Sequence, residues 1–181
     1  QWRLEQSGAG ILAFVTNHGY LDNPTFRGMR QQLMATFDEL WFVDLHGNVD
    51  KGEVPPDGKK NDNVFDIKRG VALGLFVKLP VKRGTKKKPA KVRHAHLWGK
   101  RAEKYAWLDS HDVTNTKWTA LKPQSPDYYF FPQDLRLKEE YEAGWKISDV
   151  MPVTRLGPNS HRDDFAIAFD EDTARQRFAD F

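Results

Sequence analysis

The chain has 181 residues, of which 39% are hydrophobic, and a formal net charge of +3 at pH 7. This size allows one hydrophobic core or two small ones and excludes disorder throughout, and the absence of cysteine excludes disulfides, thiolate zinc sites and cysteine nucleophiles. The first residues lack the layout of a secretory signal and no apolar run approaches the roughly 20 residues that cross a bilayer, so we expect a cytoplasmic location.

The first half of the chain begins with a strand, helix, strand pattern. Residues 10–16 form a short, partly β-branched apolar run, which predicts a strand buried on both faces. Asn23 is placed to cap a helix over residues 24–37 with Pro24 as its first residue. A second strand is expected over residues 40–45, and this unit builds parallel sheets, so the sequence predicts an α/β fold. The apolar helix positions are Phe26, Met29, Leu33, Met34 and Phe37.

A long loop is expected between the second strand and a third one. Residues 46–70 contain several glycines and prolines among scattered charges, and a loop of this length is usually functional or mobile. Residues 71–77 form a third apolar run, and Gly74 at its centre indicates a bulge or a close neighbour. Ligands of open α/β sheets bind beyond the carboxyl ends of the strands, and the loop begins at such an end, after Leu45.

The most basic stretch runs from Lys78 to Lys104, where eleven Lys or Arg residues face a single acid, Glu103. Within it, we expect residues 80–91 to form a linker or a surface hairpin. The stretch is either a solvated loop that keeps the protein soluble or a segment that contacts phosphates. Composition does not decide between these interpretations.

The second half of the chain alternates short apolar and polar segments. The expected elements are a strand over 92–98, a helix over 100–109, a strand over 128–131, a strand over 164–169 and a helix capped by Asp172 that runs toward Phe181.

Several side chains are weak candidates for chemistry. His94 and His96 share one face of a predicted strand, but no third ligand stands at a metal-site spacing, so we expect structural or phosphate-facing histidines and no metal. Asp44 and His46 are compatible with acid–base work, and we interpret them as residues at the end of a strand near the cleft. The acidic residues of 161–164 lack a lysine at nuclease spacing.

Seven stretches resemble a known protein family in their order and spacing. These stretches are GILAFVTN at 10–17, FRGMRQQL at 26–33, DLHGN at 44–48, NVFDI with GVA at 63–72, LWGKR at 97–101, YYFFP at 128–132 and RDD at 162–164. Through them the sequence resembles, over most of the chain, the adenine-specific amino-methyltransferases of DNA of the gamma class, and among them the single-polypeptide restriction-modification enzymes of type ISP.

The resemblance implies a partial Rossmann-like methyltransferase sheet of three strands and one helix in residues 1–79, and a smaller α+β segment in 92–181 that starts the target-recognition region. In the parent enzyme the methyl donor is S-adenosylmethionine. The donor-binding turn and the Asn/Asp-Pro-Pro-Tyr/Phe motif of the family are missing from this chain, so we expect it neither to bind the donor nor to contain catalytic residues. Residues 23–26 mimic that motif but follow the wrong strand and are explained as a helix cap.

The resemblance also assigns roles to residues. Phe65 would stack on a target adenine that is turned out of the duplex, whereas a lone Phe before a strand is more often part of a core. The active-site loop would include Asn17, His18, His46 and Asn63. The residues expected to contact DNA are Lys82, Arg83, Lys86, Lys87, Lys88, Arg93 and Arg101.

Two functions therefore stay open. The first is a fragment of a DNA adenine-N6 methyltransferase from a bacterial restriction-modification system, and the alternative is a non-catalytic, sequence-specific DNA-binding module. The expected partners are double-stranded DNA and the missing N-terminal part of the same enzyme, with possible self-association through an exposed sheet edge and no membrane.

Overall fold

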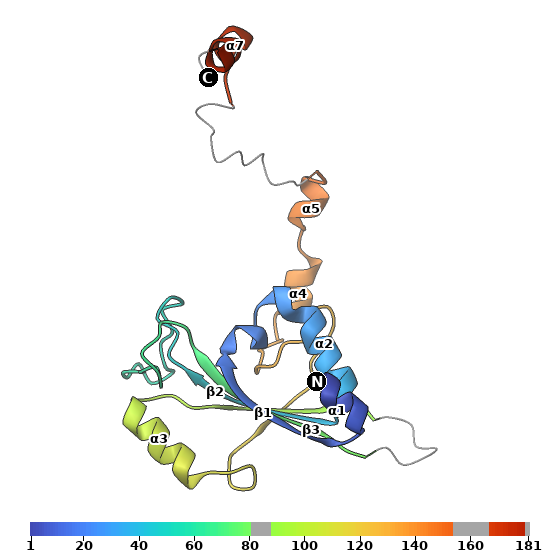
Figure 1. The fold of residues 1–181 in the computed structure, drawn as a ribbon, viewed down its shortest axis with the longest axis vertical. Helices are drawn as coiled ribbons and strands as arrows, with labels where there is room; N and C mark the ends of the chain where they lie inside the picture. Colours follow the sequence, from blue (N-terminus) through green and yellow to red (C-terminus); the bar gives the residue numbers. More distant parts are fainter. Residues whose placement is uncertain (81–87, 154–166, 180–181) are drawn as a thin grey trace. The chain divides into compact units, whose positions relative to one another are not determined.

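Five strands form one mixed sheet in the computed structural model, which describes residues 1–80, 88–153 and 167–179 (Figure 1). The sheet order is β1-β3-β2-β4-β5, in which β2 and β4 are parallel and the other neighbouring strands are antiparallel. This sheet belongs to a compact unit, residues 1–133, and residues 134–181 form a second unit. The strands are β1 (Gly10–Asn17), β2 (Glu39–His46), β3 (Val71–Lys78), β4 (Lys91–His96) and β5 (Thr119–Leu121).

The three predicted strands of the first half are present, but their arrangement differs from a simple parallel unit. β1 and β2 run in the same direction without touching, because β3 lies between them and is antiparallel to both. The long loop after β2 allows the chain to turn back and enter this gap. The prediction that β1 is buried on both faces is wrong: Ile11 and Val15 are 65% and 50% exposed, since β1 is an edge strand with one uncovered face.

One face of the sheet is covered by the short helix α1 (Trp2–Ser7) and by the segment between β1 and β2. The Phe42 ring lies at the centre of this core, with its centroid 4.8 Å from that of Phe130 and 5.4 Å from that of Phe76. A Cβ atom on Gly74 would lie only 3.1 Å from the Phe76 ring and 3.2 Å from the Phe14 ring, so the close neighbour expected at this glycine is confirmed.

The helix between β1 and β2 starts as predicted but with a tighter first turn. The Asn23 side chain accepts a hydrogen bond from Thr25 N–H at 2.9 Å, and Pro24 begins the 3-10 turn η2 (Pro24–Phe26), which leads into α2 (Arg27–Thr36). Leu33 and Phe37 are buried in the core, whereas Phe26 and Met29 are exposed. Phe26 precedes α2, and Met29 lies at the edge of the helix face that packs on the sheet.

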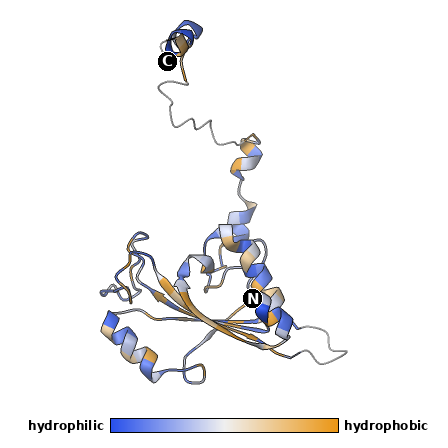
Figure 2. Cartoon of the chain, in the orientation of Figure 1, coloured by the Kyte–Doolittle hydropathy of each residue, from blue (hydrophilic) through white to orange (hydrophobic). Residues whose placement is uncertain are grey.

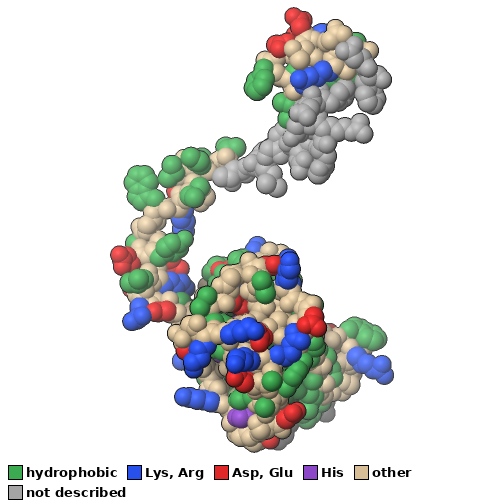
Figure 3. Space-filling model, turned by 90° about the vertical axis from the view of Figure 1, so that its left-hand side faces the viewer, with side chains coloured by type: hydrophobic (Ala, Val, Ile, Leu, Met, Phe, Trp, Pro, Cys, Tyr) green, Lys and Arg blue, Asp and Glu red, His purple; other side chains and the backbone are tan. Residues whose placement is uncertain are grey.

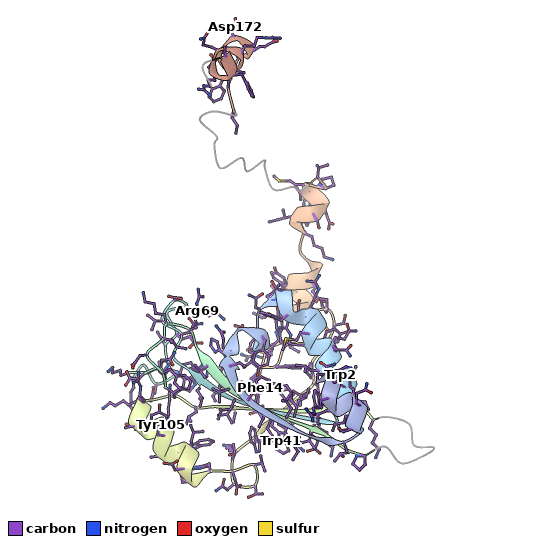
Figure 4. All side chains as sticks on the ribbon, in the orientation of Figure 1. Trp2, Phe14, Trp41, Arg69, Tyr105 and Asp172 are labelled. Carbon is purple, nitrogen blue, oxygen red and sulfur yellow. The ribbon has the colours of Figure 1, made fainter. Side chains whose placement is uncertain are left out.

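The other face of the sheet is covered by α3 (Arg101–Ser110). A second core joins Val43, Leu45 and Val71 of the sheet to Trp107 and Leu108 of the helix. Figure 2 shows the apolar strands between more polar helices and loops, and Figure 4 labels Phe14 and Trp41, which lie on opposite faces because they occupy alternating positions in the strand register.

The segment after β5 departs from the prediction. Residues 128–131 form no strand: Tyr128 has a left-handed φ of 54°, and Phe130 N–H donates to Leu21 O at 2.9 Å while its ring fills the core. The aromatic run therefore anchors a loop onto the sheet.

The second unit contains α4 (Lys138–Ala143), α5 (Ile147–Val150) and α7 (Glu171–Ala179). The predicted cap is two residues off, because Asp170 rather than Asp172 accepts from Thr173 N–H, at 2.7 Å. Residues 164–166 of the strand predicted over 164–169 lie outside the described residues, and residues 167–169 form no strand. None of the helices in the described part of the chain has the length and apolarity needed to span a membrane.

The predicted division of the chain into a catalytic part, residues 1–79, a linker, residues 80–91, and a recognition part, residues 92–181, concerns the organisation of a parent enzyme. This division stays a prediction.

Candidate functional site

The loop that follows β2 is tied together at its base by Asn63. Its side-chain amide donates to Gly47 O at 3.0 Å and to Arg69 O at 2.7 Å, and its Oδ1 accepts from Phe65 N–H at 2.9 Å. Gly47 has a φ of +82°, and a Cβ there would lie 2.6 Å from Asn63 Cα. Glycine is therefore required for the start and the end of the loop to meet.

Phe65 lies at the rim of this loop with 45% of its surface exposed, while the preceding Val64 is buried in the second core. The core-plug interpretation required a buried Phe65 ring, which is not what the structure shows. The stacking role stays a prediction.

Helix α3 holds the Phe65 segment through hydrogen bonds to its backbone. Arg101 Nε donates to Asn63 O at 2.8 Å and its guanidinium pairs with Asp66 at 2.7 Å, while Tyr105 OH donates to Val64 O at 2.6 Å. Figure 4 labels Tyr105 on α3 and Arg69 on the loop. The basic side chain expected to contact DNA, Arg101, is thus engaged in positioning the loop.

Lys104 of the same helix is completely buried. Its ammonium donates to Leu45 O at 2.7 Å, to Asn61 Oδ1 at 2.8 Å and to Asp62 O at 2.5 Å, which uses all three donors. Burial lowers the pKa of Lys104 to about 8. Sequence reasoning missed Lys104 as a functional candidate. The signal that could have indicated it is its position four residues before Leu108, which places both side chains on the same face of the predicted helix.

A cluster of histidines and carboxylates lies beneath the loop, where β2 ends. His18 Nδ1 is 3.0 Å from Asp44 Oδ1, and His46 Nδ1 is 3.6 Å from Asp44 Oδ2 and 3.5 Å from Glu53 Oε1. We call His18, Asp44, His46 and Glu53 the histidine–carboxylate cluster. The register shift of β2 between Asp44 and His46 and the left-handed φ of 52° at His46 turn the His46 ring toward Asp44.

The charges of the cluster depend on each other. Burial acts to raise the pKa of Asp44, but the hydrogen bond from His18 and the nearby imidazoles lower it below its ordinary value. Burial acts against a charged His18, yet Asp44 and Glu53 together raise the pKa of His18. Glu53 also has a lowered pKa: burial opposes its ionisation, and hydrogen bonds from His46 and from Asn48 N–H outweigh this effect.

His94 and His96 extend the cluster into β4. His96 Nδ1 lies 2.8 Å from His46 Nε2, and the His46 ring stacks on Trp98 at a centroid distance of 3.4 Å. Neither ring nitrogen of the buried His94 has a hydrogen-bond partner, and burial lowers the pKa of His94 to about 3. Asp44 supplies the third group near His94 and His96 that the sequence spacing did not reveal.

The other predicted site residues are distributed over the unit. Asn17 caps the turn η1 (His18–Leu21) by accepting from Gly19 N–H at 2.7 Å. Arg93 lies over the Trp41 ring at 4.0 Å, and Lys88 is exposed. Four predicted DNA contacts, Lys82, Arg83, Lys86 and Lys87, lie outside the described residues. Figure 3 shows Lys and Arg side chains mixed with Asp and Glu on one face of the molecule.

The expectation that this chain does not hold S-adenosylmethionine stays a prediction. After β1 the turn is filled by the buried side chains of Tyr20 and Leu21. At the start of α3, the Glu103 carboxylate already accepts from Lys100 N–H at 2.8 Å. Both turns are thus occupied by side chains of the protein itself.

Comparison with known proteins gave matches among solved structures alone: no protein-family model matches the sequence, and no curated protein does. A cryo-EM structure of a DrdV–DNA complex has a TM-score of 0.58 and 25% identity, over 73% of this chain and 13% of that chain. The ATP-dependent type ISP restriction-modification enzyme LlaBIII bound to DNA has a TM-score of 0.57 and 20% identity, over 76% of this chain and 9% of that chain.

A nuclease-deletion mutant of the type ISP enzyme LlaGI, in complex with a DNA substrate mimic, has a TM-score of 0.56 and 18% identity. That match covers 73% of this chain and 12% of that chain. The chain therefore has the fold of a region that makes up between 9% and 13% of these much longer polypeptides.

Proposed function

We propose that this chain is a region of a site-specific DNA adenine-N6 methyltransferase of a restriction-modification system, and that Phe65 stacks on the target adenine after it leaves the duplex. The observation that carries the proposal is the half-exposed Phe65 ring at the carboxyl end of β2, on a loop fixed from below. The similarity to regions of restriction-modification enzymes solved with DNA supports it.

The physical case for Phe65 rests on a rigid, open aromatic face. Extruding a base from the stack costs a few kcal/mol, and stacking on an aromatic ring returns about 1–3 kcal/mol. The return is largest when the ring is already held in place, because no loop entropy is lost on binding. The backbone on both sides of Phe65 is held by Asn63, Arg101 and Tyr105, which meets this condition.

The rest of the enzyme would supply the donor site and cover β1. The free edge of this strand and the exposed side chains of Ile11 and Val15 are surfaces that a larger sheet would bury. A cavity of about 400 Å³ on the same face is lined by Val15, Trp41 and Trp107 among others. We propose S-adenosylmethionine as the methyl donor of the full polypeptide, held outside this chain.

The experiment compares variants of the full polypeptide that carries this chain. Phe65→Ala should lower adenine methylation by about 5- to 150-fold, the equivalent of 1–3 kcal/mol of lost stacking, and Phe65→Trp should retain most of it. Ile67→Ala is the matched control, because Ile67 is a similarly exposed apolar residue of the same loop. Methylation is measured by transfer of a labelled methyl group to duplex DNA, alongside duplex affinity, which should stay unchanged.

The result that overturns the proposal is equal methylation by Phe65→Ala and Ile67→Ala.

The basic segment is tested separately: neutralising Lys82, Arg83, Lys86, Lys87 and Lys88 should lower duplex affinity and flatten its dependence on salt concentration. If Phe65→Ala lowered duplex affinity as much as these substitutions do, the chain would act as the alternative, a DNA-binding specificity module.

A further inference from the structure

We propose that the histidine–carboxylate cluster binds a first-row divalent metal ion of the Zn²⁺ type, with His18, Asp44, His46 and Glu53 as ligands. The site lies where β2 ends and the loop begins, and it is independent of the proposed role of Phe65.

The spacing of the ligand atoms fits a tetrahedral ion. Bonds of about 2.0–2.1 Å from zinc to nitrogen or oxygen place neighbouring ligand atoms roughly 3.3 Å apart. The separations are 3.0 Å from His18 Nδ1 to Asp44 Oδ1, 3.6 Å from His46 Nδ1 to Asp44 Oδ2 and 3.5 Å from His46 Nδ1 to Glu53 Oε1. His18, Asp44 and His46 thus offer ligand atoms that all lie within 4.8 Å of one another, and Glu53 adjoins His46 as the fourth group.

The electrostatics of the cluster also favour a cation. The carboxylates of Asp44 and Glu53 lie 3.6 Å and 3.5 Å from His46 Nδ1 in a largely buried position, and buried carboxylates are stable only when a positive charge or hydrogen-bond donors compensate them. A proton on imidazole supplies a single positive charge. A divalent ion supplies two and replaces protons on its ligands.

The second nitrogen of each imidazole has a partner that orients it. His46 Nε2 lies 2.8 Å from His96 Nδ1, which leaves Nδ1 facing the carboxylates. His18 Nε2 accepts from the Asn48 side-chain amide at 3.0 Å, and Asn48 is itself fixed because its Oδ1 accepts from Lys51 N–H. Such partners on the far side of the ring are typical of metal-binding histidines.

The cluster is rigid and still reachable from solvent. The His46 ring stacks nearly parallel on Trp98, at an interplanar angle of 9°, and the His18 ring lies so close to Gly70 that a Cβ there would be 2.3 Å away. Glu53 retains 17% exposure of its side chain, and His96 is exposed beside His46. Metal ions can therefore enter without unfolding of the strand ends.

The ligand types select the class of metal. Imidazole nitrogens favour Zn²⁺, Co²⁺ and their neighbours over Mg²⁺ and Ca²⁺, which prefer oxygen ligands in larger numbers. A second group, Asp44 with His94 and His96, shares the Asp44 carboxylate. Both groups cannot use that carboxylate for separate tetrahedral ions, and we assign the ion to the group that has a second carboxylate, Glu53, beside it.

The test is a titration of the 181-residue chain with Zn²⁺ by calorimetry and with Co²⁺ by visible absorption. We expect one ion per chain with micromolar or tighter affinity, tetrahedral Co²⁺ bands, and no competition from millimolar Mg²⁺. His46→Asn and Glu53→Gln should each weaken Zn²⁺ binding at least about tenfold. His111→Asn and His94→Asn are controls that should keep the wild-type affinity, because neither residue is a proposed ligand.

Circular dichroism of each variant without metal shows whether it is folded, and Glu53→Gln decides the test if His46→Asn does not fold. The proposal is overturned if wild-type protein binds no Zn²⁺ below millimolar concentration, or if His46→Asn and Glu53→Gln bind as tightly as wild type. It is also overturned if His94→Asn alone removes binding, since the ion would then lie in the other group.

Discussion

Replacing Lys104 by Met should destabilise the chain by about 3 kcal/mol. Met keeps most of the volume and packing of the lysine stem but removes the donor of Leu45 O and Asp62 O, while Asn61 Oδ1 keeps only its hydrogen bond from Gly99 N–H at 3.3 Å. Each buried acceptor that loses its partner costs about 1–3 kcal/mol. Removal of the ammonium offsets part of this loss. Burial, which lowers the pKa of Lys104 from 10.5 to about 8, outweighs the attraction of nearby carboxylates, and the net cost of keeping the charge is about 3 kcal/mol.

The assay is equilibrium unfolding in urea at neutral pH, with Lys117→Met as a control because Lys117 is exposed. The control should change the free energy of unfolding by less than about 0.5 kcal/mol. Hydrogen exchange should also accelerate in the loop between β2 and β3 of Lys104→Met, because two of the three acceptors belong to that loop. A Lys104→Met variant as stable as wild type would refute the reasoning that this ammonium ties the loop to the sheet.

Four further substitutions test the packing and the charges of the first unit. Gly70→Ala should destabilise the protein by about 1–3 kcal/mol, because the added Cβ would collide with the His18 ring. Gly28→Ala should stabilise it by about 0.5–1 kcal/mol, because Gly28 lies on α2 with open space around its Cβ position. Thermal unfolding measures both changes. Phe42→Ala should cost about 3–5 kcal/mol in urea unfolding, because this fully buried ring contacts three other aromatic rings. The free energy of unfolding should fall as the pH decreases from 6.5 toward 3, because the unfolded chain protonates His94 in this range and the folded chain, in which the pKa of His94 is about 3, does not. With a chelator present, the free energy of unfolding of His94→Leu should fall by up to about 1.4 kcal/mol less per pH unit than that of the wild type. An unchanged slope would contradict this explanation.

The sequence predicted the elements of the first half well because their signals are local. Three apolar runs and the Asn23–Pro24 cap each depend on neighbouring residues, and all appear as strands or as a helix start. The position of β3 between β1 and β2 depends on where a 24-residue loop, from Gly47 to Gly70, delivers the chain. No local pattern encodes that path, so the parallel arrangement of adjacent strands was expected instead.

The site was predictable in part for the same reason. The loop after β2 and its exposed aromatic residue follow from the position of a strand end and from family resemblance. The histidine–carboxylate cluster joins residues 18, 44, 46 and 53 from three segments, and the β4 histidines join it from about 50 residues further on. Its members come together because β1, β2 and β4 run in the same direction and end at the same edge of the sheet, which is a consequence of the sheet order.

The way in which α3 holds the loop has a consequence for the proposed enzyme. Arg101, Lys104 and Tyr105 come from the part of the chain expected to begin the recognition region, yet all three donate to residues 61–66 of the loop that presents Phe65. A displacement of α3 on DNA would therefore move the Phe65 backbone directly, without an intervening flexible joint. Under the proposed function, binding of the recognition region and placement of the ring that receives the base are mechanically linked.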